Sequence, residues 1–421
     1  MEKYQGYRCS LCATEYTPDQ VTYTCPKDGG NLDVVLDLER IRKDWSPKRF
    51  SADWEPSLWR YLPLLPVEDP GGAGTPIHMA GWTPLYQPLV LAKQLGLTHL
   101  WVKDEGRNPT ASFKDRASAV VVARARQIQA EVVVTASTGN AGAALAGMSA
   151  AVGQKAVIFA PKNAPPAKVA QLLIFGATVV LVDGNYDQAF DLTIEASHEF
   201  GWYCRNTGYN PFTVEGKKTA ALEIWEQVLL PGLAREKRLC VFMSVGDGNI
   251  ISGMHKGFKD LQALGWLDDK TQMPRIFGVQ AEGSAAVTQA FLAGNEQIPT
   301  ISAQTLADSI SVDLPRDGVR AVRAARETGG TYLTVPDTEI LRAIADLGKV
   351  GIFAEPAGAT AYAGLCKAVS TGLILPDDPV LVVNTGNGLK DIRAAMQAVQ
   401  AAPVIEPTLQ ALIRSKIPEK I

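Results

Sequence analysis

The sequence contains no uninterrupted apolar run long enough to cross a membrane, and its first residues lack the apolar core of a signal peptide. It also has no surplus of positive charge, because 41 Lys and Arg residues stand against 44 Asp and Glu residues. We therefore expect neither a membrane nor a nucleic acid as a partner, and a cytoplasmic location.

Cysteine and histidine are also scarce. Six Cys residues in 421, three of them isolated in apolar surroundings (Cys204, Cys240 and Cys366), do not predict a disulfide framework. The four His residues show no spacing typical of metal ligands or of a catalytic triad. No Gly-x-Gly-x-x-Gly fingerprint follows the first strand, which argues against a dinucleotide-dependent oxidoreductase.

From Gly81 onward, short β-branched runs alternate with Ala-rich helical stretches. The runs at 132–134, 157–159, 179–182 and 241–243 predict buried strands, each followed by turn-forming residues and a helical pattern. This alternation predicts an α/β fold with parallel sheets flanked by helices. In such sheets the functional site lies at the carboxyl ends of the strands.

The segment Asn108-Pro109-Thr110-Ala111-Ser112-Phe113-Lys114-Asp115-Arg116 separates a strand-like run from a helical pattern. Lys114 is thus expected at a helix N-terminus, where the helix dipole disfavours a cation. An imine with an aldehyde cofactor would remove this conflict, and the positive helix end would lower the pKa of the amine. On residue type alone, a surface lysine is the alternative.

This nonapeptide resembles the lysine motif of the fold-type II (tryptophan synthase β-like) pyridoxal-phosphate (PLP) enzymes, most closely that of threonine synthase. The resemblance implies a two-domain fold-type II PLP enzyme in which Lys114 attaches the cofactor and later moves protons. Ala111 stands where that family usually has Gly. We therefore expect a turn that needs no backbone conformation restricted to Gly.

Two further motifs follow strand-like runs and extend the resemblance. The segment Ser137-Thr138-Gly139-Asn140 opens a helix of small residues. The resemblance implies that its first three residues bind the substrate carboxylate and that Asn140 contacts the phenolic oxygen of the cofactor. Gly246-Asp247-Gly248-Asn249-Ile250 resembles the cup for the cofactor phosphate, with the Asp247 side chain pointing outward.

A third motif, Asn384-Thr385-Gly386-Asn387, resembles a family motif whose Thr faces the pyridine nitrogen, although Asn387 replaces the usual His. A neutral hydroxyl at Thr385 leaves that nitrogen unprotonated, which suits elimination and disfavours transamination. The implied reaction converts O-phosphohomoserine to threonine and phosphate by γ-elimination and β-hydration.

One segment departs from the family pattern. Threonine synthases usually carry an Arg that grips the substrate phosphate bidentately. Thr213 stands at that position, and Lys217 replaces a Gln. Either Lys217 reaches the substrate phosphate, or the substrate lacks one. The second alternative describes a serine/threonine dehydratase-type β-eliminase or a β/γ-replacement enzyme acting on a non-phosphorylated amino acid. The segment from Glu355 to Ala359, shared with dehydratases, is expected to shape the pocket wall.

Residues 1–36 predict a small module similar to a zinc ribbon, because three Cys residues and an Asp follow ribbon-like spacing. Its candidate ligands are Cys9, Cys12, Cys25 and Asp28. Many threonine synthases have a fourth Cys at the last position. A ribbon held by its own packing, with reduced thiols, is the alternative, and a non-enzymatic zinc-ribbon binding protein is a third class of function.

The remaining chain divides into three predicted parts. Residues 37–76 form a linker whose Trp45, Trp54 and Trp59 should be covered by the main body or a partner subunit. A large PLP domain comprises 77–104 and 206–421, and a small mobile domain comprises 105–205. The resemblance implies a small amino-acid substrate and a homodimer.

Overall fold

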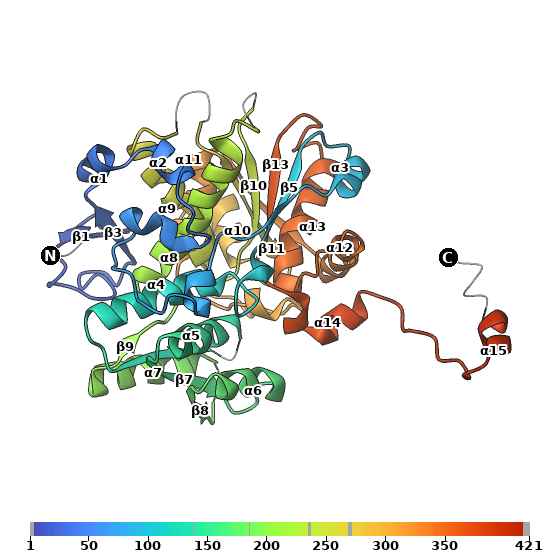
Figure 1. Cartoon of the computed structure of the whole chain (residues 1–421), viewed down its shortest axis with the longest axis horizontal. Coiled ribbons are helices and arrows are strands. Elements are labelled where there is room, and N and C mark those ends of the chain that lie inside the picture. Colours follow the sequence, from blue (N-terminus) through green and yellow to red (C-terminus); the bar gives the residue numbers. More distant parts are fainter. Residues whose placement is uncertain (1–3, 138, 185, 235–236, 268–271, 416–421) are drawn as a thin grey trace.

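The computed structural model describes residues 4–137, 139–184, 186–234, 237–267 and 272–415 (Figure 1). The N-terminal module is a three-stranded antiparallel sheet in the order β2-β1-β3. Its strands are β1 (Tyr4–Cys9), β2 (Glu15–Tyr16) and β3 (Leu32–Leu36). Two turns of this module bring the candidate metal ligands to one end of the sheet.

The larger of the two remaining sheets has six strands in the order β12-β11-β10-β13-β5-β4. All neighbours are parallel except β4, which is antiparallel to β5. The strands are β4 (Leu85–Tyr86), β5 (Leu100–Asp104), β10 (Cys240–Ser244), β11 (Arg275–Ala281), β12 (Tyr332–Val335) and β13 (Val380–Asn384). Every residue of β5, β10 and β13 is buried, and these central strands are mostly apolar, with polar residues toward their carboxyl ends.

The second sheet has four parallel strands in the order β8-β7-β6-β9. They are β6 (Val132–Ala136), β7 (Lys155–Pro161), β8 (Thr178–Val182) and β9 (Tyr203–Cys204). The run at 179–182 is a strand, but the prediction that it is buried is wrong. It forms the edge of the sheet, where Leu181 remains 51% exposed, because β-branched runs also suit edge strands.

Helices cover both parallel sheets, as an α/β fold requires (Figure 1). Helix α8 is buried along its whole length and packs against both α4 and α9. The first seven helices along the chain are α1 (Leu38–Asp44), α2 (Pro47–Ser51), α3 (Leu89–Leu95), α4 (Lys114–Gln127), α5 (Asn140–Ala151), α6 (Pro166–Ile174) and α7 (Tyr186–Phe200). The others are α8 (Phe212–Ile224), α9 (Asn249–Ala263), α10 (Ala286–Leu292), α11 (Gly318–Thr328), α12 (Asp337–Lys349), α13 (Pro356–Ser370), α14 (Ile392–Gln397) and α15 (Leu409–Arg414).

The predicted linker is largely packed against the main body. Trp59 is buried and donates its indole N–H to the Ile77 carbonyl, and Arg60 forms a buried ion pair with Glu226. Trp54 is 95% exposed, so the main body does not cover it, and cover by a partner subunit stays a prediction. Sequence shows the hydrophobicity of a residue but not the direction of its side chain in an irregular segment.

At the other end of the chain, α15 lies apart from the main body at the end of an extended arm (Figure 1). Within the described ranges, none of the helices has the length and apolar character needed to cross a membrane. The domain boundaries given above and the mobility of residues 105–205 stay predictions.

Candidate active site

One pocket brings together most of the residues that the sequence singled out. It encloses about 500 Å³ of space, part of it open to solvent. Its wall includes Lys114, Asn140, Gly246 to Ile250 and Thr385. These residues follow β6, β10 and β13 or begin helices, so the pocket lies at the carboxyl ends of parallel strands.

Lys114 begins α4, as expected from its sequence context. Its Nζ makes no hydrogen bond or ion pair with any described residue. The pKa of this amine is lowered from 10.5 to about 8, chiefly by burial and next by the nearby Arg205 guanidinium, while Glu355 and Asp247 oppose the shift. The sequence predicted a lowered pKa from the helix dipole, whereas burial is the main cause in the structure.

The loop before Lys114 is fixed to the loop that carries Thr385. Phe113 N donates to the Thr385 carbonyl at 2.9 Å, and Asn387 N donates to the Ala111 carbonyl at 3.0 Å. Ala111 has a φ of 66°, in the left-handed region. The expectation that this turn needs no Gly-type conformation is therefore wrong, and Ala111 adopts that conformation at a cost of about 1–2 kcal/mol.

The predicted phosphate cup joins β10 to α9. Gly248 has a φ of 90°, and a Cβ there would lie 2.6 Å from the Asp317 carbonyl oxygen. A Cβ on Gly246 would lie 2.8 Å from Ile310 Cα, so both positions require Gly. The free backbone N–H groups at the start of α9 offer an anion site. These features fit a phosphate group.

Asp247 is the acidic residue within this cup. Its carboxylate accepts a hydrogen bond from Arg316 N at 2.6 Å, on a neighbouring loop. Burial raises the pKa of Asp247 to about 7, and the nearby Asp317 carboxylate adds to the rise. A carboxyl group that takes up a proton near neutral pH opposes a bound anion less than a permanent charge would.

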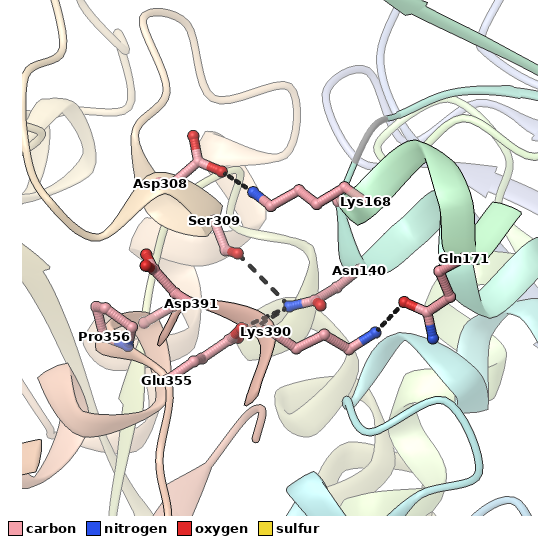
Figure 2. Close-up of a pocket in the computed structure, with 11 residues that line it drawn as sticks. Asn140, Lys168, Gln171, Asp308, Ser309, Glu355, Pro356, Lys390 and Asp391 are labelled. Atoms are coloured by element: carbon pink, nitrogen blue, oxygen red, sulfur yellow. Dashed lines mark hydrogen bonds and ion pairs between the residues drawn. The ribbon is translucent and has the colours of Figure 1, made fainter. Parts of the chain in front are cut away.

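Asn140 begins α5 and contacts Glu355, for which the sequence predicted only a place in the pocket wall. Its Nδ2 donates to Glu355 Oε1 at 2.9 Å and Oε2 at 3.0 Å, and lies 3.5 Å from Ser309 Oγ (Figure 2). Burial raises the pKa of Glu355, while the hydrogen bond from Asn140 lowers it. Glu355 is therefore a titratable group inside the pocket, close enough to affect the Lys114 amine.

A second pocket adjoins the first and shares Asn140, Ser309 and Glu355 with it. Figure 2 shows two lysines at this opening, each extended toward a residue on the opposite side. Lys168 pairs with Asp308 at 2.6 Å, and Lys390 donates to Gln171 at 3.0 Å. Helix α6 therefore meets the η5 (Asp308–Ile310) and η6 (Gly388–Lys390) turns across the opening.

The loop predicted to bind the substrate carboxylate borders this opening. Gly139 lines the second pocket, and a Cβ there would meet no atom within 4 Å. Ser137 is buried, and its Oγ accepts a hydrogen bond from Gly139 N at 3.2 Å. Thr138 lies outside the described residues.

Thr385 lies on the pocket wall, as its motif predicts, and its Oγ1 is 3.5 Å from Ser244 Oγ. Lys217 does not line the pocket. It is buried on α8, and its Nζ donates to Asn249 Oδ1 in the cup. Burial lowers the pKa of Lys217 well below its usual value, with Lys114 the second cause. Its role toward the substrate stays a prediction.

Arg205 is a residue near the pocket that sequence reasoning missed. It follows β9, its side chain is buried, and its Nη1 donates to Thr207 Oγ1 on the pocket wall at 2.6 Å. An Arg directly after a short strand gives no signal in the sequence by which a buried cation could be told from a surface one.

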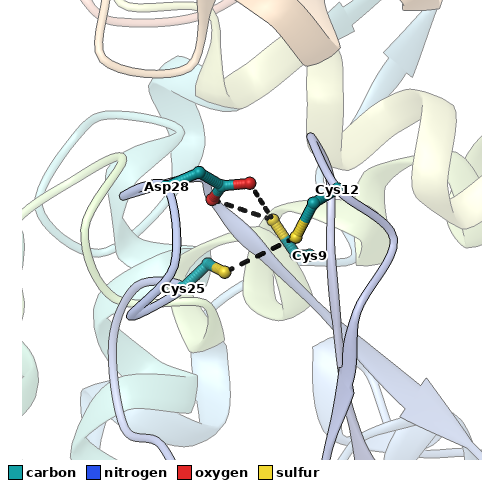
Figure 3. A group of neighbouring side chains, drawn as sticks. All are labelled: Cys9, Cys12, Cys25 and Asp28. Atoms are coloured by element: carbon teal, nitrogen blue, oxygen red, sulfur yellow. Dashed lines mark hydrogen bonds between the residues drawn. The ribbon is translucent and has the colours of Figure 1, made fainter.

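The four candidate metal ligands of the N-terminal module also come together (Figure 3). Their ligand atoms all lie within 4.8 Å of one another. Cys12 Sγ and Cys25 Sγ are 3.7 Å apart, close to the edge of about 3.8 Å in a tetrahedron with zinc–sulfur bonds of about 2.3 Å. Gly30 N donates to Asp28 Oδ1 at 2.9 Å and Leu11 N to Cys9 Sγ at 3.3 Å, so the donor set is oriented by backbone N–H groups.

Comparison with known proteins agrees with this geometry. Residues 78–386 match the family model described as pyridoxal-phosphate dependent enzyme. The chain is 38% identical to the threonine synthase of Methanocaldococcus jannaschii over 97% of this chain and 98% of that protein. It is 37% identical to the threonine synthase of Methanosarcina acetivorans over 96% and 97%.

Among solved structures, threonine deaminase isoform 2 from Solanum lycopersicum is similar in fold. The TM-score is 0.66 at 23% identity, over 81% of this chain and 88% of that chain. Diaminopropionate ammonia lyase from Escherichia coli gives a TM-score of 0.63 at 20% identity, over 76% and 89%. The family model and the relatives point to the same cofactor as the residues of the pocket. The chain belongs to the family of pyridoxal-phosphate dependent enzymes.

Proposed function

We propose that this protein is a threonine synthase, which converts O-phosphohomoserine to threonine and phosphate. The observation that carries the proposal is the pocket that joins Lys114, Asn140, the Gly246 to Ile250 cup and Thr385. Identity of 38% to a threonine synthase along almost the whole of both chains supports the same reaction.

The residues of the pocket fit PLP at both of its ends. The start of α9 would hold the phosphate, and Lys114 would attach the aldehyde carbon. Asn140 would contact the phenolic oxygen, and the Thr385 hydroxyl would face the ring nitrogen. When bound, PLP supplies an electron sink that stabilises negative charge developing on the substrate.

Lys114 has the properties that proton transfer requires. Because its pKa is lowered to about 8, about a fifth of the amine is neutral at pH 7.4 and can accept a proton from the α-carbon. The Ser137 to Gly139 loop would hold the substrate carboxylate. Burial raises the pKa of Glu355, so this carboxyl group could hold a proton in the pocket that Lys114 also lines.

A dehydratase-type β-elimination is the second candidate. The observation that favours it is Thr213, whose hydroxyl cannot supply the positive charge of the Arg that it replaces. Thr213 Oγ1 donates to the Asn210 carbonyl at 2.7 Å and lies 3.2 Å from Asn249 Oδ1, so this side chain is fully engaged within the protein.

Turnover of O-phosphohomoserine, serine and threonine, measured side by side with product identification, separates the two candidates. A threonine synthase releases phosphate and threonine from the first compound, whereas a dehydratase releases 2-oxo acids from the other two. Lys114→Ala should abolish turnover, and exposed Lys349→Ala serves as its control. Formation of 2-oxo acids alone would exclude threonine synthase.

We also propose that the N-terminal module binds one zinc ion through Cys9, Cys12, Cys25 and Asp28. The separation of Cys12 Sγ and Cys25 Sγ and the grouping of all four ligand atoms within 4.8 Å support this proposal. The cluster lies in the antiparallel sheet and not in the PLP pocket, so the ion would have a structural role.

We further propose a homodimer in the cytoplasm. The arm that ends in α15 carries Val404, Leu409 and Ile413, which are 98%, 73% and 61% exposed, and a second copy of the chain is a natural cover for these side chains. All six Cys residues are free thiols, which suits a reducing compartment. Light scattering at several concentrations tests the oligomeric state.

A further inference from the structure

The proposed function requires a positive charge beside the substrate phosphate, and none of the residues assigned above supplies it. A substrate phosphate needs a cation, because a desolvated anion is costly without an opposite charge. Thr213 carries no charge, and its hydroxyl is bonded within the protein. Lys217 Nζ is directed to Asn249, a residue of the cup that would hold the cofactor phosphate.

Arg205 meets this requirement better than either of them. Its Nε donates to Ser118 Oγ at 3.2 Å and its Nη1 to Thr207 Oγ1 at 2.6 Å, both of which are neutral hydroxyl oxygens. Its Nη2 is buried and has no hydrogen-bond partner. Among the residues that the structure describes, no carboxylate lies within ion-pair distance of this guanidinium. A buried guanidinium with two hydroxyl partners is suited to an anion.

Arg205 lies next to the active site, although its partner Thr207 and not Arg205 itself lines the pocket. Thr207, its partner, lines the same pocket as Lys114. Ser118, its other partner, lies one helical turn after Lys114 on α4, so the guanidinium lies beside the helix that begins with this lysine. Its positive charge also lowers the pKa of Lys114, second only to burial as a cause. The carboxylates of Asp115 and Asp247 raise the pKa of Arg205, against the lowering by burial, but neither forms an ion pair with it.

We propose that Arg205, together with the Thr207 hydroxyl, binds the phosphate of a phosphorylated amino-acid substrate and replaces the Arg that the family carries at position 213. A guanidinium offers two parallel N–H donors to a phosphate, which a lysine cannot do. The cofactor phosphate would have the α9 cup and Lys217, and the substrate carboxylate would have the Ser137 to Gly139 loop. The hydrogen-bond partners of Arg205, Ser118 and Thr207, belong to neither. This proposal rests on the proposed function for the identity of the substrate.

The test uses the PLP-loaded enzyme and its Arg205→Met and Arg205→Lys variants, with Arg342→Met on the exposed face of α12 as control. Three quantities are measured: the KM for O-phosphohomoserine, the Kd of its phosphonate analogue with CH2 in place of the ester oxygen, and the Kd of PLP. Binding of the phosphonate is followed by the change in cofactor absorbance, which needs no catalysis.

We expect Arg205→Met to raise the KM and the phosphonate Kd by about ten- to a hundredfold, with the PLP Kd little changed. Arg205→Lys should recover part of the affinity, because it restores charge without the planar fork. A larger loss of PLP affinity than of phosphonate affinity would overturn the proposal and assign Arg205 to the cofactor. An unchanged phosphonate Kd in Arg205→Met would also overturn it.

The outcome for the proposed function is read separately. If the wild-type enzyme forms no threonine but binds the phosphonate in an Arg205-dependent way, threonine synthase activity is excluded and the anion subsite stands. If threonine forms and Arg205→Met has the KM of the wild type, the proposed function stands and the subsite is excluded. Cofactor absorbance and circular dichroism of each variant show whether it is folded.

Discussion

The pH dependence of cofactor attachment should report the pKa of Lys114. Only the neutral amine attacks the aldehyde, so the rate constant for covalent PLP attachment should rise with pH and level off above a midpoint near 8, the lowered pKa of this lysine. An ordinary exposed lysine would give a midpoint near 10.5. The cause of the difference is burial, with a contribution from Arg205.

The size of the effect follows from these two values. At pH 8, about half of the Lys114 amines are neutral, compared with about 0.3% for a lysine with a pKa near 10.5. The difference is about 150-fold in the concentration of the reactive form. Below pH 7 the rate constant should fall about tenfold per pH unit, because protonation then removes the reactive form in proportion.

Rapid mixing of the cofactor-free protein with PLP, followed by visible absorbance from pH 6 to pH 10, measures this curve. Arg205→Met should move the midpoint to higher pH, since a neighbouring positive charge is removed, and Glu355→Gln should move it to lower pH, since a negative charge is removed. Lys114→Ala should give no covalent signal. A rate constant that still rises steeply at pH 10, or a midpoint that neither variant moves, would refute this description of the site.

Three further changes test other parts of the structure. Ala111→Gly should raise the free energy of unfolding by about 1 kcal/mol in urea titrations, because it removes the left-handed strain; a loss of stability would show that the strain is absent. Glu223→Gln should lower the free energy of unfolding by about 3–5 kcal/mol, because Arg116 and Lys103 lose the buried carboxylate with which both form ion pairs. A change below about 1 kcal/mol would argue against these ion pairs. Cys12→Ser should lower the zinc content, measured by atomic emission, from one ion per chain to background; a wild-type protein without zinc would end the ribbon proposal.

The sequence was most informative where a local pattern and a chemical need coincide. The apolar runs at 132–134 and 241–243, each followed by turn-forming residues, predicted strands, and both lie in parallel strands of the structure. The motif around Lys114 indicated the family and the cofactor. The grouping of Asn140, the cup and Thr385 at one pocket followed from the rule that strand ends meet at one edge of a parallel sheet.

Other features depend on contacts between distant segments, which periodicity does not record. The exposure of Leu181 depends on strand order, since an edge strand and a central strand have similar composition. The left-handed turn at Ala111 is maintained by contacts with the loop around Asn387. Arg205 became a candidate only when its burial and its unpaired Nη2 were seen.

The backbone link between the Ala111 to Lys114 loop and the Thr385 to Asn387 loop fixes the spacing of the two residues that would hold opposite edges of the cofactor ring. A main-chain hydrogen bond joins backbone atoms, so it does not depend directly on which side chain the residue carries. Evolution could therefore vary Ala111 and Asn387 while the distance from the attaching amine to the threonine hydroxyl remained constant. Substrate preference can diverge in this enzyme without a change in how the ring is seated.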